Sequence, residues 1–102
     1  MHAVTIRLPF KPDTDWDLVS TKFATFIART KGDYPKLNTA VLAKVSPTEG
    51  IFTVIYDDAE TMHHVSSEIA PAWFNGEIKQ HLAGNFARTA GVVVAGSVAG
   101  LH

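Results

Sequence analysis

The alternation of hydrophobic and polar residues predicts four β-strands. "HAVTIRL" near the N-terminus alternates and is rich in branched residues, as strands are. "KLNTAVLAKVS" and "IFTVIYD" predict two more strands, and the turn residues "PTEG" between them predict a hairpin. "NFARTAGVVVAGSVAG" predicts a long fourth strand, with a bulge at Gly91 or Gly96.

A different spacing predicts a first helix over residues 15–30. Thr14 is the expected N-cap, with Asp17 three residues later completing a capping box, and Gly32 is the expected end. The apolar face consists of residues that recur every three or four positions: Trp16, Val19, Phe23, Phe26, Ile27 and Thr30.

The stretch "TMHHVSSEIAPAWFNGEIKQH", residues 61–81, predicts a second helix that begins at a capping box of Asp57 and Glu60. Because the residue before a proline avoids helical geometry, Ala70 is expected to mark a break or kink before Pro71. Pro71 suits the first turn of a new segment, which Gly84 can close.

The resulting order, β-α-β-β-α-β, predicts an α+β, ferredoxin-like single domain over residues 1–102 with a four-stranded antiparallel sheet. Two helices cover only one face of such a sheet. Yet Ile51 and Ile55 point to one face, and Phe52, Val54 and Tyr56 point to the other. An exposed sheet face is normally polar, so we expect a homodimer that buries the uncovered face.

This order of elements, with the passages "EGIFTVIYDDAETM" and "ARTAGVVVAG", resembles the dimeric α+β barrel superfamily. Within that superfamily the chain resembles the small antibiotic-biosynthesis monooxygenase-like proteins. The resemblance implies a dimeric α+β barrel. The superfamily also contains isomerases, haem-degrading enzymes, peroxidases and proteins of unknown role, so the fold alone leaves the activity open.

Composition excludes several classes of function. The chain has no Cys, which removes disulfides, thiolate catalysis and thiolate metal sites. A formal net charge of −1, without a basic block, argues against nucleic acid and anionic membranes as partners. The longest apolar run, "GVVVAGSVAG", is too short to span a bilayer, and the first residues do not resemble a signal peptide. We therefore expect a cytoplasmic protein.

The candidate catalytic residues come from the second helix. On a helical wheel restarted at Pro71, His81 shares the apolar arc of the segment, Glu77 lies one turn before it, and Trp73 flanks the arc. This predicts His81 as a catalytic base, Glu77 as the carboxylate that orients it, and Trp73 as part of an apolar substrate pocket. The alternative is a structural, partly buried histidine. His63 and His64 fall on the exposed side.

Three strand residues are further candidates for substrate binding. Tyr56 and Asn38 could line a pocket, and Arg7 could bind an anionic substrate, although solvent or an ion pair is the simpler environment for Arg7. "DTDWD" resembles the start of a calcium loop but lacks its later glycine and glutamate, so no metal site is expected.

Four functions remain in competition. The first is a cofactor-independent monooxygenase acting on a small aromatic or phenolic molecule, with His81 as base and no cofactor. The second is a non-catalytic homodimer with a ligand-binding or structural role, and the third is an isomerase or cyclase. The fourth, haem degradation, is disfavoured because relatives with that activity carry an Asn on the first strand, where "HAVTIRL" has none.

Overall fold

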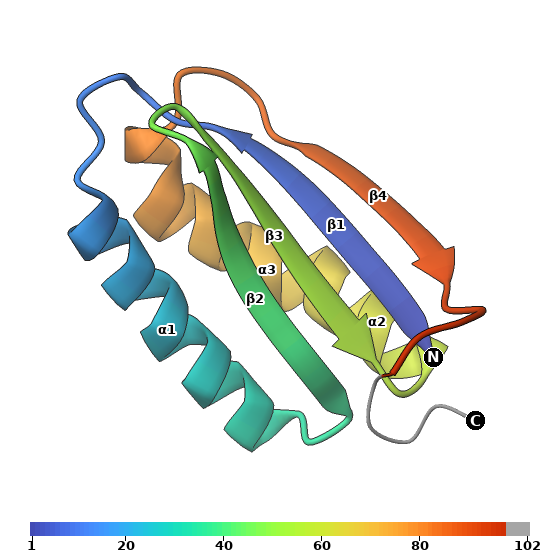
Figure 1. Ribbon diagram of the computed structural model, residues 1–102. Coiled ribbons are helices and arrows are strands. Elements are labelled where there is room, and N and C mark those ends of the chain that lie inside the picture. The colour runs from blue at the N-terminus through green and yellow to red at the C-terminus, as the bar shows by residue number, and fades with distance from the viewer. Residues whose placement is uncertain (98–102) are drawn as a thin grey trace.

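A computed structural model describes residues 1–97 and shows one antiparallel sheet with helices on one face (Figure 1). The strands are β1 (His2–Pro9), β2 (Leu37–Ser46), β3 (Glu49–Tyr56) and β4 (Ala87–Val92), in the spatial order β2-β3-β1-β4. β1 is central: Val4 pairs with Val54 of β3 on one side and with Ala90 of β4 on the other. The predicted β-α-β-β-α-β order and four-stranded antiparallel sheet are confirmed.

The N-cap of each helix is one residue later in the sequence than predicted. Helix α1 (Trp16–Asp33) is capped by Asp15, whose carboxylate accepts from the backbone N–H of Leu18, so the expected Thr14 cap is wrong. Helix α2 (Ala59–His64) is capped by Asp58, which accepts from the N–H of Thr61, in place of Asp57. In each case two residues that commonly cap helices are adjacent in the sequence, and the second of them is the N-cap in the structure.

The end expected for α1 at Gly32 is also wrong. The helix continues to Asp33, and the N–H of Tyr34 still donates to the carbonyl of Thr30. The chain then turns at once into β2, because the N–H of Leu37 donates to the Tyr34 carbonyl at 2.9 Å.

The second helical segment, residues 59–81, runs through Pro71, so a break at Ala70 is wrong, but the helix type changes there and a new α-helical stretch begins with Pro71 in its first turn, as expected. It consists of α2, the π-turn η1 (Val65–Ile69), α3 (Ala70–Trp73), the π-turn η2 (Phe74–Ile78) and the 3₁₀ turn η3 (Lys79–His81). Ala70 has φ −65° and ψ −45°, and its N–H donates to the carbonyl of Val65 across the widened turn. A π-turn relieves the clash that a proline ring makes with the carbonyl four residues earlier.

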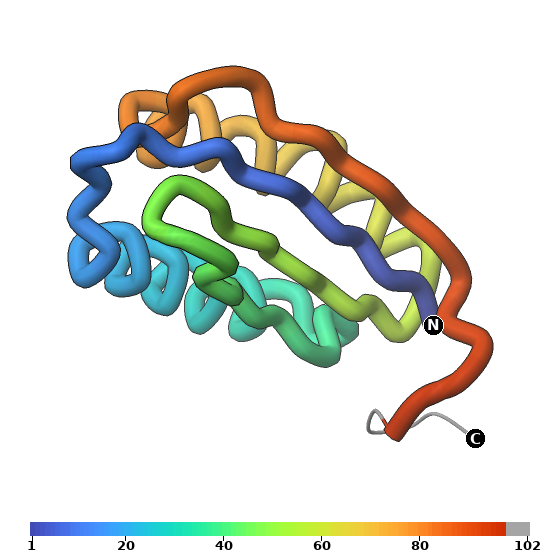
Figure 2. The backbone as a smooth tube through the Cα atoms, turned by 45° about the horizontal axis from the view of Figure 1, so that its top comes forward, coloured from blue at the N-terminus to red at the C-terminus, as the bar shows by residue number. Residues whose placement is uncertain are grey.

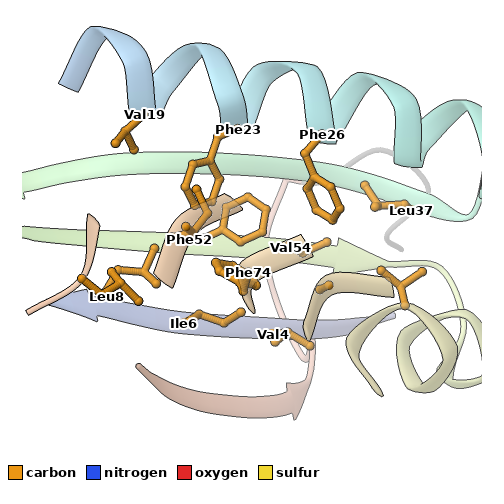
Figure 3. Close-up of a cluster of buried hydrophobic side chains, with 14 of the residues drawn as sticks. Val4, Ile6, Leu8, Val19, Phe23, Phe26, Leu37, Phe52, Val54 and Phe74 are labelled. Carbon is orange, nitrogen blue, oxygen red and sulfur yellow. The ribbon is translucent and has the colours of Figure 1, made fainter. Parts of the chain in front are cut away.

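The molecule has two layers, a twisted sheet and a pair of helical segments against its inner face (Figure 2). Phe23 and Phe26 of α1 point from the helix toward the strands (Figure 3), and Phe23 meets Phe52 of β3 edge-on, with ring centroids 5.0 Å apart. Trp73 stacks on Phe26 at 4.2 Å. The core is built from buried residues of every element except η3 and β4, with Phe10 and Leu82 from the connections: Val4, Ile6, Leu8, Phe10, Val19, Phe23, Phe26, Leu37, Phe52, Val54, Tyr56, Met62, Val65, Ala70, Phe74, Ile78 and Leu82.

The outer face of the sheet has no helix over it, and it carries apolar side chains, as predicted, together with Arg7, Thr5, Thr53 and Thr89. Ile51 and Ile55 of β3 lie there half-buried, whereas Phe52, Val54 and Tyr56 are buried toward the helices. On β2, Val41 and Val45 are 53% and 54% exposed on the same outer side. This uncovered face is the feature that led us to expect a homodimer.

The fourth strand is shorter than predicted among the described residues, since β4 ends at Val92 and residues 98–100 of the expected strand lie outside them. Gly91 pairs directly with Ala3 in an unbroken register, so the bulge expected there is wrong. Gly96 lies beyond the strand with φ 151°, a backbone conformation that favours glycine. Within residues 1–97, no helix is long and apolar enough to cross a membrane.

Candidate functional site

An apolar cavity of about 70 Å³ lies between the inner face of the sheet and both helical segments. Its walls come from α1, from β1 to β3, from the turn η1 with α3 and η2, and from the chain leading into β4. The lining residues are Val4, Ile6, Phe26, Ile27, Leu37, Ala40, Phe52, Val54, Tyr56, Val65, Ser66, Ala70, Pro71, Phe74, Phe86 and Arg88. Concave apolar sites with few polar groups are typical of small-molecule binding.

Three polar side chains line this cavity: Tyr56, Ser66 and Arg88. Arg88 Nη2 donates to Ser66 Oγ at 2.9 Å, which ties β4 to the π-turn η1. The Ser66 hydroxyl in turn donates to the backbone carbonyl of Met62, one helical turn earlier. Ser66 is therefore the acceptor that holds the guanidinium of the exposed Arg88 at the cavity lining.

Tyr56 contributes a phenol that stays protonated. Burial raises its pKa to about 12, and the positive charge of Arg88 opposes that shift only in part. At neutral pH Tyr56 is therefore a hydrogen-bond donor for a bound molecule and not a base. Arg88 supplies a permanent positive charge beside it.

His81, the predicted base, lies outside this lining. Its Nε2 is 3.2 Å from Lys22 Nζ, and the same Lys22 nitrogen is 3.5 Å from Glu77 Oε2, so Lys22 stands where Glu77 was expected as the partner of His81. Burial lowers the pKa of His81, and the charges of Lys22 and Lys11 lower it further. The geometry makes His81 a neutral acceptor; the catalytic roles of His81 and Glu77 stay predictions.

The remaining predicted site residues are placed as follows. Trp73 packs against Phe26, which lines the cavity, and lies behind the wall and not in it. Arg7 is exposed on the outer face and forms an ion pair with Glu49, the simpler environment considered from the sequence.

Asn38 Nδ2 donates to Asp57 Oδ1 at 3.0 Å, beyond the end of β3 and outside the cavity lining. Of the six predicted site residues, Tyr56 alone lines the cavity.

Two residues of the cavity were missed by sequence reasoning. Arg88 could have been found, because it follows Phe86 by two positions and strand alternation places both on one face. Ser66 could also have been found, because it follows the buried Met62 by four residues, a spacing that puts both on one side of a helix. Among residues 1–97, no three His, Asp or Glu side chains are grouped so as to hold a metal ion.

The sequence matches no protein-family model and no curated protein, but the fold matches solved structures. A protein of unknown function from Nitrosomonas europaea aligns with a TM-score of 0.76 at 15% identity, over 95% of this chain and 92% of its own. A monooxygenase from the gene ActVA-Orf6 of Streptomyces coelicolor, solved with the ligand nanaomycin D, aligns at 0.74 and 11% identity, over 95% and 90%.

SnoaB from Streptomyces nogalater, described as a cofactor-independent oxygenase, aligns with a TM-score of 0.72 at 7% identity, over 93% of this chain and 94% of its own. This chain has the fold of the antibiotic-biosynthesis monooxygenase-like proteins. At identities this low, the similarity shows a shared monooxygenase-like fold. It does not show a shared substrate or shared site residues.

Proposed function

We propose that the cavity binds a small aromatic molecule with an ionisable hydroxyl and that the protein is a cofactor-independent monooxygenase. The observation that carries this is the combination of an apolar cavity with one cation, Arg88, and one neutral phenol, Tyr56, in its lining. The structural neighbour described as a cofactor-independent oxygenase supports the same class of reaction.

The chemistry asks little of the protein. A bound phenol loses its proton to solvent, since a cation within about 4–6 Å stabilises the phenolate. The phenolate then reduces O₂ directly, and the net change is phenol plus O₂ to quinone plus water. Arg88 holds the developing oxyanion, Tyr56 donates a hydrogen bond to it, and the apolar walls exclude bulk water. His81 is the predicted alternative acceptor of the proton.

The size of the cavity restricts how the substrate lies. Its volume of about 70 Å³ is about half of the roughly 150 Å³ in which an engineered apolar cavity holds benzene. A ring must therefore enter with only part of its surface enclosed or displace a lining side chain. Phe86, half-buried just before β4, is one such side chain.

The test uses 4-nitrophenol, whose phenolate is coloured. Binding to the wild-type protein should lower the pKa of the phenol by about one unit or more, because a nearby opposite charge stabilises the anion. Arg88→Gln should abolish the shift, while Arg29→Gln, a change of a cation outside the cavity lining, should not. An unshifted pKa in the wild-type complex would refute the site.

Turnover is a separate measurement. With an electron-rich phenol such as 1,5-dihydroxynaphthalene, oxygen uptake should match quinone formation in the wild type and fall in Arg88→Gln. A shifted pKa without oxygen uptake would instead establish the alternative, a ligand-binding protein without catalysis.

We also propose that the chain is a homodimer through its uncovered sheet face. Val41 and Val45 are more than half exposed there beside Ile51 and Ile55. Exposed apolar patches of this kind mark association surfaces. Light scattering at low micromolar concentration should give twice the chain mass of 11.1 kDa, and Val41→Lys should give the single mass. A folded wild-type monomer would overturn the proposal.

A further inference from the structure

A second cluster of reactive side chains lies outside the cavity, where the C-terminal end of α1 meets α2. Tyr34 Oη is 2.9 Å from His64 Nε2, and His64 Nδ1 is 2.8 Å from Glu68 Oε2. The rings of Tyr34 and His64 also contact each other, with centroids 5.3 Å apart and planes inclined by 54°. Two polar contacts and a ring contact hold the three side chains in series.

The polarity of this series follows from its acidic end. An ionised carboxylate only accepts hydrogen bonds, so Glu68 requires the proton of a neutral His64 on Nδ1. The lone pair of His64 is then on Nε2, where it accepts the hydroxyl proton of Tyr34. A nucleophile that donates to a base, which a carboxylate orients, is the arrangement that activates hydroxyl nucleophiles in enzymes.

Backbone hydrogen bonds and a shared helical segment fix the position of each member. The N–H of Tyr34 donates to Thr30 at 2.8 Å, and its carbonyl accepts from Leu37 at 2.9 Å, so both sides of its peptide are held. His64 and Glu68 are four residues apart on one continuous helical segment, a spacing that brings side chains together. Backbone hydrogen bonds therefore hold Tyr34 in the short connection between α1 and β2, and one helical segment carries the other two residues.

A groove of about 390 Å³ borders Tyr34, between α1 and the second helical segment. Arg29 and the half-buried Trp73 line it together with Asp33 and Glu77. Trp73 offers an aromatic surface, and Arg29 offers a cation for a carbonyl oxygen that becomes negative during attack. The groove thus suits an electrophile that carries an aromatic group.

We propose that Tyr34, His64 and Glu68 form a base-activated tyrosine site that accepts acyl groups from aryl esters. Tyr34 Oη bonds to the carbonyl carbon as its proton passes to His64 Nε2, and the bond to the aryl oxygen breaks. The aryloxide leaves with that proton. Water, deprotonated by His64, then attacks the acyl-tyrosine, and Tyr34 regains its proton. The net reaction is hydrolysis of the ester to a carboxylic acid and a phenol.

The sequence makes this site simple to test, because it has two tyrosines. Tyr56 lines the cavity, but its pKa of about 12 keeps its phenol protonated and slow to react, and peptide mass spectrometry distinguishes a label on Tyr34 from one on Tyr56. Benzenesulfonyl fluoride is the probe: Tyr34 Oη bonds to sulfur, fluoride leaves with the proton, and the sulfonate ester survives peptide mass spectrometry. At pH 8 Tyr34 should react at least about tenfold faster than N-acetyltyrosinamide, as expected of general-base assistance.

Substitutions test whether His64 acts as a general base or only as a structural hydrogen-bond partner of Tyr34. His64→Gln keeps a hydrogen-bonding side chain without a base and should slow labelling about 10²-fold, whereas Glu68→Gln should slow it less. His63→Ala, a change of the adjacent exposed histidine, should leave the rate unchanged. Circular dichroism verifies that each variant is folded. A wild-type rate equal to that of N-acetyltyrosinamide, or an unchanged rate in both His64→Gln and Glu68→Gln, overturns the proposal.

Esters test the acyl step directly. With 4-nitrophenyl acetate the wild-type protein should release a burst of about one nitrophenolate per chain before steady turnover. Tyr34→Phe should remove that burst. A burst that persists in Tyr34→Phe places acylation elsewhere and refutes Tyr34 as the nucleophile.

Discussion

Gly50 lies buried on β3 where two aromatic rings meet the strand, and Gly50→Ala tests how tightly they are held. An added Cβ would lie 2.9 Å from Phe10 Cε2 and 3.2 Å from Trp16 Cη2. Real Cβ atoms essentially never come closer than 3.0 Å to another heavy atom, so the Phe10 ring must move.

The rings have little room to move. They meet edge-on with centroids 4.8 Å apart, and Trp16 Nε1 donates to the Pro47 carbonyl at 2.9 Å. Overpacking costs about 1–3 kcal/mol, and a lost hydrogen bond about 0.5–1.5 kcal/mol. Relief of the glycine's backbone entropy returns about 0.5–1 kcal/mol. We therefore expect Gly50→Ala to lower the free energy of unfolding by about 2 kcal/mol.

Urea unfolding at one fixed protein concentration measures this change, because a self-associating chain has concentration-dependent stability. Gly32→Ala in α1 is the matched control: its Cβ meets no atom within 4 Å, and alanine should stabilise the helix by up to about 1 kcal/mol. Phe10→Leu should partly rescue Gly50→Ala by making space. Equal effects of Gly50→Ala and Gly32→Ala would refute the packing argument.

Three further predictions concern the polar groups. Ser66→Ala removes the hydrogen bond that holds the Arg88 guanidinium and should weaken 4-nitrophenolate binding about 3–10-fold, because this exposed bond is worth about 0.5–1.5 kcal/mol. Lys22→Met should raise the pKa of His81 in NMR titration, since Lys22 is the largest charged cause of its depression. Hydrogen bonds from Thr61 lower the pKa of Asp58 from 3.8 to about 2, so this cap stabilises above pH 3.8 and loses its effect toward pH 2. Asp58→Asn should remove that part of the acid dependence in urea unfolding.

Each of these has a neighbour that serves as control. Ser67→Ala, one residue along η1 and exposed, should not change phenolate binding. Glu77→Gln should leave the pKa of His81 in place, because Glu77 is not among the groups that shift it. Glu60→Gln, in the first turn of the same helix, should preserve the acid dependence. If a control substitution had the effect and the substitution it is paired with did not, the role assigned to that residue would be contradicted.

Most of the fold could be predicted from the alternation of apolar and polar residues along the strands. The division of β3 into Phe52, Val54 and Tyr56 on one face and Ile51 and Ile55 on the other is confirmed residue by residue. The strand period is two, so an error of one residue at a strand end leaves the assignment of faces unchanged. The assignment of a helix cap is more sensitive, because an error of one residue names the wrong cap. Adjacent capping residues at Asp57 and Asp58 made the start of α2 ambiguous by one position.

The site depended on the one element whose geometry the sequence did not reveal. A wheel that advances by 100° per residue places His81 toward the sheet, but two π-turns precede it in the folded chain and His81 itself ends the 3₁₀ turn η3. Each turn shifts the angular position of the residues that follow. A proline in the sequence predicts where regular α-helical hydrogen bonding is interrupted. It does not predict whether the helix ends there or continues through a π-turn.

The aromatic cluster behind the cavity makes the protein its own optical sensor. Trp73 stacks on Phe26 at 4.2 Å and meets Phe74 at 5.3 Å, and both phenylalanines line the cavity. Trp16 lies apart, hydrogen-bonded to Pro47. A molecule that enters the cavity presses on the rings that touch Trp73, so the emission of Trp73 should respond while that of Trp16 stays constant. The Trp16→Phe protein therefore reports occupancy by its fluorescence, without a label and before the natural ligand is known.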